Sequence, residues 1–79
     1  IAGLHGVNAE IIEFAIHRKN QLVNRPISEL PFPDESIIAG IVRGSESFVP
    51  EGDLYLKLGD KVIVLALPAA IPRLEKLFK

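Results

Sequence analysis

The chain contains no cysteine, no methionine and no tryptophan among its 79 residues. Without cysteine, thiol catalysis, thiolate metal sites and disulfides are excluded, and the composition fits a reducing cytosolic setting. The absence of methionine, with Ile1 at the start, leads us to expect a segment of a longer protein. Nine basic and ten acidic side chains give a formal net charge of −1. No Lys/Arg cluster of the kind that neutralises phosphates is present, so we expect no nucleic-acid partner.

Long hydrophobic runs and catalytic patterns are also missing. The longest apolar run, at 62–71, is interrupted by Pro68 and is far shorter than the roughly 20 residues that span a bilayer. Nothing at the N-terminus resembles a signal peptide, so we expect a soluble domain without membrane insertion. No nucleophile stands beside a base, and no Gly-rich phosphate loop or ligand cluster occurs. We therefore expect neither an enzyme nor a metal site.

Two histidines and two Gly-Asp pairs are the residues that reactive or metal chemistry would use. His5 lies among glycines in a segment without periodicity, and His17 follows the end of a predicted strand, where a solvated corner residue is favoured over a ligand. The pairs Gly52-Asp53 and Gly59-Asp60 suggest calcium, but calcium loops space several oxygen ligands at alternate positions. Each Asp stands alone, so Asx-type turns are favoured.

Strands are predicted through the centre of the chain. β-Branched and aromatic residues fill the runs and Gly, Pro, Asp and Ser fill the gaps, which is typical of strands and hairpins. The runs lie at 37–42, 47–49 and 61–67. Gly44 would supply the positive φ of the first hairpin turn. An earlier alternating run at 10–16 predicts the first strand.

The predicted helical segments are short. Pro26 opens a single turn at 27–30 that Pro31 ends, and Phe32 is the candidate for a buried plug. The segment at 68–79 has apolar residues at helical spacing, and its helix should begin at about Ala69 or Ala70 so that Pro72 falls in the first turn. The sequence therefore predicts an α+β fold of order β-α-β-β-β-α. Its small mixed or antiparallel sheet would have about four strands, covered by the C-terminal helix.

The predicted strand at 37–42 is apolar on both alternating faces. Its two sets are Ile37, Ala39, Ile41 and Ile38, Gly40, Val42. Both faces of the sheet therefore need a cover. One face can take the chain's own helices, and a second copy of the chain covers the other most economically, so we expect a homodimer. The candidates for the dimer or core interface are Ile37, Ile38, Ile41 and Val64.

Five stretches, taken in order, resemble the TrkA C-terminal domain, also called the C-terminal domain of regulators of potassium conductance. They lie at 10–14, 22–30, 37–44, 49–53 and 58–64, and they include Pro-x-Gly-Asp and Leu-Gly-Asp turns. The resemblance is strongest to the members that close the regulatory subunit of bacterial Trk potassium uptake systems. It implies that residues 10–79 form the regulatory domain and that residues 1–9 are a linker from a missing upstream domain.

The resemblance also implies a function and partners. Members of the family are cytoplasmic, non-catalytic modules that self-associate and regulate potassium uptake systems or channels. The implied partners are a second copy, an upstream Rossmann-type nucleotide-binding domain and a membrane potassium transporter subunit. The transporter would hold the domain at the inner face of the cell membrane. NAD or ATP would bind the Rossmann domain, so no cofactor is expected in this chain.

A ligand site in the dimer cleft is one of three roles that the sequence leaves open. Some relatives bind cyclic di-AMP there, through the short helix and the loop after it. Ile27 and Ser28 occupy the helix positions, but the loop at 31–35 has two acidic residues and no arginine to meet a phosphate. Arg25 and Arg43 remain as candidates. The second role is a pure assembly domain without ligand, and the third is a small β-barrel RNA-binding module, whose strand entry resembles the sequence at 58–62.

Overall fold

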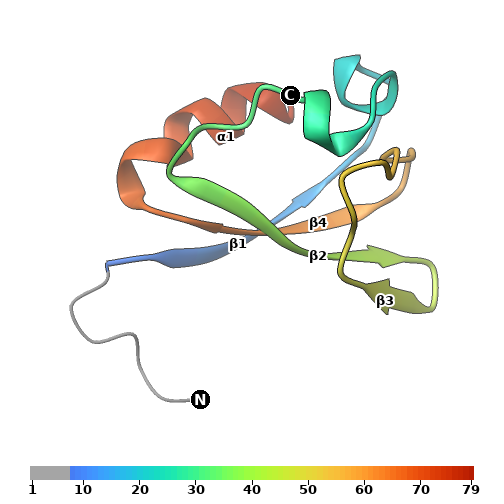
Figure 1. The fold of residues 1–79 in the computed structure, drawn as a ribbon, viewed down its shortest axis with the longest axis horizontal. Coiled ribbons are helices and arrows are strands. Elements are labelled where there is room, and N and C mark those ends of the chain that lie inside the picture. The colour runs from blue at the N-terminus through green and yellow to red at the C-terminus, as the bar shows by residue number, and fades with distance from the viewer. Residues whose placement is uncertain (1–7) are drawn as a thin grey trace.

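A computed structural model describes residues 8–79, which form an antiparallel sheet with helical segments on one side (Figure 1). The strands are β1 (Glu10–Ala15), β2 (Ser36–Arg43), β3 (Glu46–Phe48) and β4 (Lys61–Ala66), in the spatial order β1-β4-β2-β3. The helical segments are the 3₁₀ turns η1 (Gln21–Val23), η2 (Ile27–Glu29) and η3 (Pro68–Ala70) and the α-helix α1 (Ile71–Leu77). The α+β class and the predicted order are confirmed, and the open sheet does not support a small β-barrel. The His5 and linker predictions fall almost entirely outside the described residues.

β4 lies between β1 and β2 because its sequence is apolar on both sides. Val62, Val64 and Ala66 point toward the helical segments and are at most 1% exposed. Ile63 and Leu65 alternate with them and lie half-buried on the opposite face. A strand with two apolar faces is stable only inside a sheet, where neighbours satisfy both of its edges. β1 and β2 provide those edges, both antiparallel to β4.

The C-terminal segment covers the inner face of the sheet, which we define as the face toward α1 (Figure 1). Ala70, Leu74 and Leu77 follow at helical spacing and are all buried. Pro72 falls in the first turn of α1, where its missing N–H costs no helical hydrogen bond. The predicted start of the helix is therefore confirmed. Among the described residues, no helix has the length and apolar character needed to cross a membrane.

Three aromatic rings join β1, the residue that caps the end of α1, and the loop after η2. Phe14 stacks on Phe78, with ring centroids 4.4 Å apart and planes 4° apart. Phe32 meets the same Phe78 ring at 6.0 Å in a tilted arrangement. Each such pair stabilises the fold by roughly 0.5–1.5 kcal/mol beyond what the burial of the rings contributes. Phe32 is half-buried, so it is a wall of this cluster and not the fully buried plug that its flanking prolines suggested.

A β-bulge in β2 changes which of its side chains share a face. Ile38 lies opposite Val64, but Gly40 lies opposite Ile63, so Ala39 is an extra residue between two ladder positions. One extra residue moves every later side chain to the other face. The strict alternation predicted for 37–42 is therefore wrong beyond Ala39. The face away from α1 carries Ile37, Gly40 and Val42, and the inner face carries Ile38 and Ile41.

The segment between β3 and β4 returns beside η2. Ile27 donates its backbone N–H to the Leu54 carbonyl at 2.9 Å, and Ser28 donates to the Gly52 carbonyl at 3.0 Å. Pro26 and Tyr55 form an isolated antiparallel bridge between the same two segments. These bonds hold η2 against the sheet domain. They also place the turn at 50–53 next to the start of β2.

Candidate functional site

Among residues 8–79, Asp60 is the one charged residue that is buried, and Arg43 neutralises its charge. The Arg43 Nε donates to Oδ1 of Asp60 at 2.9 Å, and Nη2 donates to Oδ2 at 2.8 Å. The Lys57 backbone N–H donates to the same Oδ2 at 2.8 Å. Asp60 is 1% exposed and the Arg43 side chain 26% exposed. This two-pronged pair ties the end of β2 to the turn that precedes β4.

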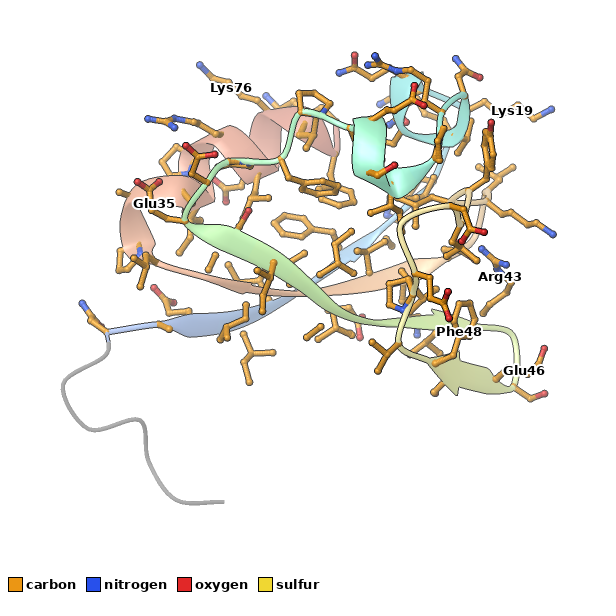
Figure 2. All side chains as sticks on the ribbon, in the orientation of Figure 1. Lys19, Glu35, Arg43, Glu46, Phe48 and Lys76 are labelled. Atoms are coloured by element: carbon orange, nitrogen blue, oxygen red, sulfur yellow. The ribbon has the colours of Figure 1, made fainter. Side chains whose placement is uncertain are left out.

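The remaining contacts of Arg43 are also structural. Its Nη2 donates to the Tyr55 carbonyl at 3.1 Å, and its guanidinium carbon lies 5.3 Å from the centre of the Phe48 ring. Figure 2 shows Arg43 beside Phe48 at the end of the sheet that carries β3. With Asp60 holding its Nε and Nη2 edge, the structure gives no support to Arg43 as a phosphate contact. The Asx-type turn expected at Asp60 is replaced by this ion pair.

The environment sets the protonation of both partners. Burial raises the pKa of the Asp60 carboxyl, but the hydrogen bonds from Arg43 and from the Lys57 amide outweigh it, so the pKa lies below its ordinary value. The same hydrogen bond to Asp60 raises the pKa of Arg43. Both groups are therefore charged at neutral pH. The arrangement fits a structural clamp and leaves no free base or nucleophile at this point.

This clamp predicts an acid-sensitive fold. Because folding lowers the pKa of Asp60, its contribution to stability is present above the unfolded pKa of about 3.9 and is lost as pH falls through the folded value. We expect the difference in free energy of unfolding between the natural chain and Asp60→Asn to shrink as pH falls from 6 toward 3, measured by urea unfolding. Asp53→Asn, at an exposed carboxyl, is the matched control. Parallel curves for the natural chain and Asp60→Asn would contradict the assignment.

A shallow groove opens between η2 and the first half of β2, with a volume of about 280 Å³. Its apolar walls are Ile27, Leu30, Phe32, Ile37, Ile38 and Pro50. Glu51 also lines it, and none of its lining residues is a lysine or arginine. Typical ligand sites enclose about 300–1,000 Å³. One copy therefore offers an open, apolar half-site that is poorly suited to a phosphate.

The four predicted ligand residues do not converge on this groove. Ile27 lines it, and Ser28 lies beside it through its bond to the Gly52 carbonyl. Arg25 is exposed and is not among the lining residues. Arg43 ends β2, whereas the groove lies at the beginning of that strand. The structure thus brings together the two helix residues and leaves out both arginines.

The face of the sheet opposite α1, which we call the outer face, is apolar and carries no element of the described chain (Figure 1). Ile11, Ile37 and Val49 are 74%, 61% and 77% exposed. The outer face consists of Ile11, Glu13, Ala15, Ile37, Gly40, Val42, Lys61, Ile63 and Leu65, with Ser47 and Val49 at the β3 edge. A large exposed apolar patch rimmed by polar residues marks an interaction surface.

The predicted interface residues divide between this face and the core. Ile37 lies on the outer face, and Ile38 lies half-buried on the inner face. Ile41 and Val64 are 1% and 0% exposed and pack inside the chain's own core. Sequence reasoning missed Ile11, Lys61 and Val49 as members of the open surface. The register of β1 against β4 reveals Ile11 and Lys61, and the pairing of β3 with β2 reveals Val49, which follows Phe48.

The remaining candidates show no metal chemistry. His17 is exposed at the corner after β1. Within residues 8–79, no group of three or more His, Asp or Glu side chains is placed to hold a metal ion. Asp53 and Asp60, the acids of the two Gly-Asp pairs, have different surroundings, since Asp53 is exposed and Asp60 is bound to Arg43.

Comparison with known proteins places this fold in a family. The TrkA-C domain model matches residues 11–79. The chain is 36% identical over 76 residues to "Trk system potassium uptake protein TrkA homolog 1" of Methanosarcina mazei, which covers 96% of this chain and 17% of that protein. It is 32% identical to "Trk system potassium uptake protein TrkA" of Haemophilus influenzae, covering 95% and 17%. The chain therefore spans about a sixth of the length of these relatives.

A solved structure agrees with the sequence relatives. The chain superposes on the protein described as "Structure of RCK domain with cda" with a TM-score of 0.76 and 28% identity, covering 87% of this chain and 97% of that one. With 69 consecutive residues matched by the family model, from 11 to 79, the chain belongs to the TrkA-C domain family.

Proposed function

We propose that this domain is a self-associating, non-catalytic regulatory module of a Trk-type potassium uptake system. The observation that carries the proposal is the outer face, an apolar surface on a sheet whose other face is already filled by the chain's own helices. Its relatives named as Trk potassium uptake proteins support the system in which it acts. The proposed partners are a second copy, a nucleotide-binding domain of the same protein and a membrane potassium transporter subunit, which would hold it at the cytoplasmic face of the membrane.

The proposed mechanism is a shift between two relative orientations of a pair of domains. A ligand or partner that binds one orientation more tightly moves the population toward it, and only that difference in affinity can do so. The change would reach the nucleotide-binding domain through the N-terminal end of the chain, which precedes β1 at the edge of the sheet. No reacting group is needed for this role. NAD or ATP would act in the nucleotide-binding domain and not here.

The groove beside η2 is the proposed half-site for a small ligand. Its apolar walls suit a flat ring system better than a phosphate, because Glu51 is its charged lining residue. A second copy that brings an equivalent groove opposite the first would roughly double the enclosed volume and reach the range of ordinary ligand sites. Cyclic di-AMP, which combines two adenine rings with two phosphates, tests this half-site because only the rings find a matching surface.

A ligand-binding experiment separates a sensor from a pure assembly domain. Sedimentation equilibrium of the chain with cyclic di-AMP, AMP or ATP should show tighter self-association with a ligand that bridges two grooves. Ile27→Asp, which places a charge in the groove wall, should abolish that ligand effect and leave the ligand-free association in place. Glu29→Ala, on the same turn and exposed, is the control. Association that ignores every nucleotide would contradict the sensor role for these ligands and favour the pure assembly domain, a role that fits the acidic lining of the groove.

A further inference from the structure

We infer that the outer face forms a two-fold interface in which Glu13 of each copy pairs with Lys61 of the other, with Gly40 close to the axis. This inference rests on the proposed self-association and adds the surface, the orientation and the residues that determine it. Two copies stacked face to face are related by an axis that lies between the sheets, parallel to their planes. In such an isologous interface each contact occurs twice.

The two charges of the outer face are placed for this exchange. Glu13 lies opposite Ile63, and Lys61 lies opposite Ala15, so Glu13 and Lys61 are diagonal neighbours on adjacent strands. Diagonal neighbours are about 7–8 Å apart at the backbone. Both side chains are exposed. Stacking a second apolar sheet on this face would remove water from both charges, and a complementary charge from the second copy offsets that cost.

The same axis also matches apolar side chains. Strands lie about 4.8 Å apart and rise about 3.4 Å per residue, which converts the pairing register into positions on a flat grid. On that grid, the axis that exchanges Glu13 and Lys61 brings Ile11 near Val42 of the second copy. It also brings Ile37 near Val49 of the second copy. The strands of the two sheets then cross at roughly 70°, close to the orthogonal class of sheet packing.

Gly40 leaves room for close approach at this position. It lies mid-strand on β2, where a glycine weakens pairing and contributes no side chain to pack. Its backbone does not need glycine, since its φ is not positive. A Cβ at Gly40 would lie 3.6 Å from the Phe48 carbonyl oxygen, an ordinary contact. Gly40 directly follows the bulge at Ala39, where a strand glycine is common, and its missing side chain also leaves room for a second sheet to approach.

A hollow in the outer face lies over Gly40, where the second copy would approach. Val42, Val49 and Ile63 are among the residues that line it. On the grid, Gly40 lies within a few ångström of the proposed axis, so the same hollow of the second copy faces it. Side chains that rim the hollow, such as Ile63, can then enter the space opposite, as knobs do between packed sheets.

The size of the outer face suits a weak dimer of this chain. Four strands about 4.8 Å apart and about six residues long give a flat area of roughly 400 Å² per copy. That is somewhat less than a tenth of the 5402 Å² surface of the chain. Two copies together would bury about 800 Å², which lies below the roughly 1,200–2,000 Å² of standard interfaces, where weak or transient complexes are found. We therefore expect a dissociation constant in the micromolar range, on the order of 1–100 μM.

Charge reversal with rescue tests the pairing, with sedimentation equilibrium as the readout. Glu13→Lys and Lys61→Glu should each weaken self-association at least about tenfold, because each places like charges together twice. An equimolar mixture of the two variants should form a heterodimer of nearly natural affinity, since every pair is then Lys with Glu. Glu10→Lys on β1 and Lys76→Glu on α1 make the same charge changes away from the outer face and should leave association unchanged.

The possible results are distinguishable. A natural chain that stays monomeric at several hundred micromolar overturns both the proposed function and this inference. A natural dimer that neither variant weakens overturns this inference alone and assigns the outer face to another occupant, such as a neighbouring domain. Variants that weaken the dimer without rescue on mixing overturn the Glu13–Lys61 pairing. Thermal unfolding of each variant at a concentration where it is monomeric should match the natural chain, which shows that the substitutions act on association.

Discussion

Asp60→Ala is expected to lower the free energy of unfolding by about 2–4 kcal/mol. The substitution removes the acceptor of both Arg43 hydrogen bonds and of the Lys57 N–H. Breaking a fully buried pair costs about 3–5 kcal/mol, but Arg43 keeps 26% of its side chain exposed and regains some hydration, which lowers the cost. Urea unfolding at pH 7 and at one protein concentration measures the change, because self-association would itself stabilise the chain.

The paired control for Asp60→Ala is Asp53→Ala. Both aspartates follow a glycine in a turn, yet Asp53 is exposed. Surface substitutions of this kind usually change stability by at most about 0.5 kcal/mol. If both variants lost the same small amount of stability, the clamp between β2 and β4 would not be a main support of the fold, and the acid sensitivity attributed to Asp60 would lose its basis.

Leu74→Ala is expected to cost about 2–5 kcal/mol, as other buried leucines do when a cavity is left behind. Leu74 is 0% exposed, and it lies on α1 between Ala70 and Leu77, the other two buried positions of that stripe. Because α1 covers the inner face of the sheet, the substitution leaves a gap between two layers that the short helix can close only in part. Thermal or urea unfolding measures the loss.

The control for Leu74→Ala is Glu75→Ala, one residue further along the same helix. Glu75 is exposed, and alanine is a good helix former, so stability should change by at most about 0.5 kcal/mol. Equal stability of Leu74→Ala and the natural chain would mean that α1 does not pack on the sheet as the structure shows. It would also weaken the inference that the outer face alone is left without a cover.

Local sequence patterns were enough to predict the elements of this fold. β-Branched runs at 37–42 and 61–67 become β2 and β4, because such residues fit a pleated surface and are bounded by turn residues. Gly44 has a φ of 61°, as its place in the hairpin required. Pro72 fixes the start of the last helix through its missing N–H. Each of these features depends on residues close together in the chain.

Features that depend on distant pairing could not be predicted. The spatial order β1-β4-β2-β3 makes β4 the neighbour of two strands from which long segments separate it. Only that register places Val42 opposite Lys61, and therefore Arg43 beside Asp60 at the next position. The bulge at Ala39 is signalled in the sequence only by Gly40, a glycine inside a strand, and that signal does not say which residue is the extra one. Strict alternation along 37–42 therefore assigns the residues after Ala39 to the wrong face of the sheet, and these residues include Gly40 and Val42 of the outer face.

The candidate site shows the same division. Ile27 and Ser28 were candidates because the family resemblance implies a ligand site at the short helical turn, and the structure places both beside the groove. Arg43 was a candidate because arginine meets phosphates, but a buried carboxylate 17 positions later in the sequence holds it instead. Nothing near Arg43 in the sequence indicates that partner. Glu13 and Lys61 became candidates for an interface only when the register put them on one face.

Sedimentation equilibrium of the natural chain, without any ligand and across roughly 1–500 μM, tests the central claim that this is a self-associating module. The apolar outer face predicts a reversible monomer–dimer equilibrium, with the weight-average mass rising from 8.7 kDa toward twice that value. A mass that stays at 8.7 kDa over the whole range would contradict the account, because the outer face would then remain open to water in solution.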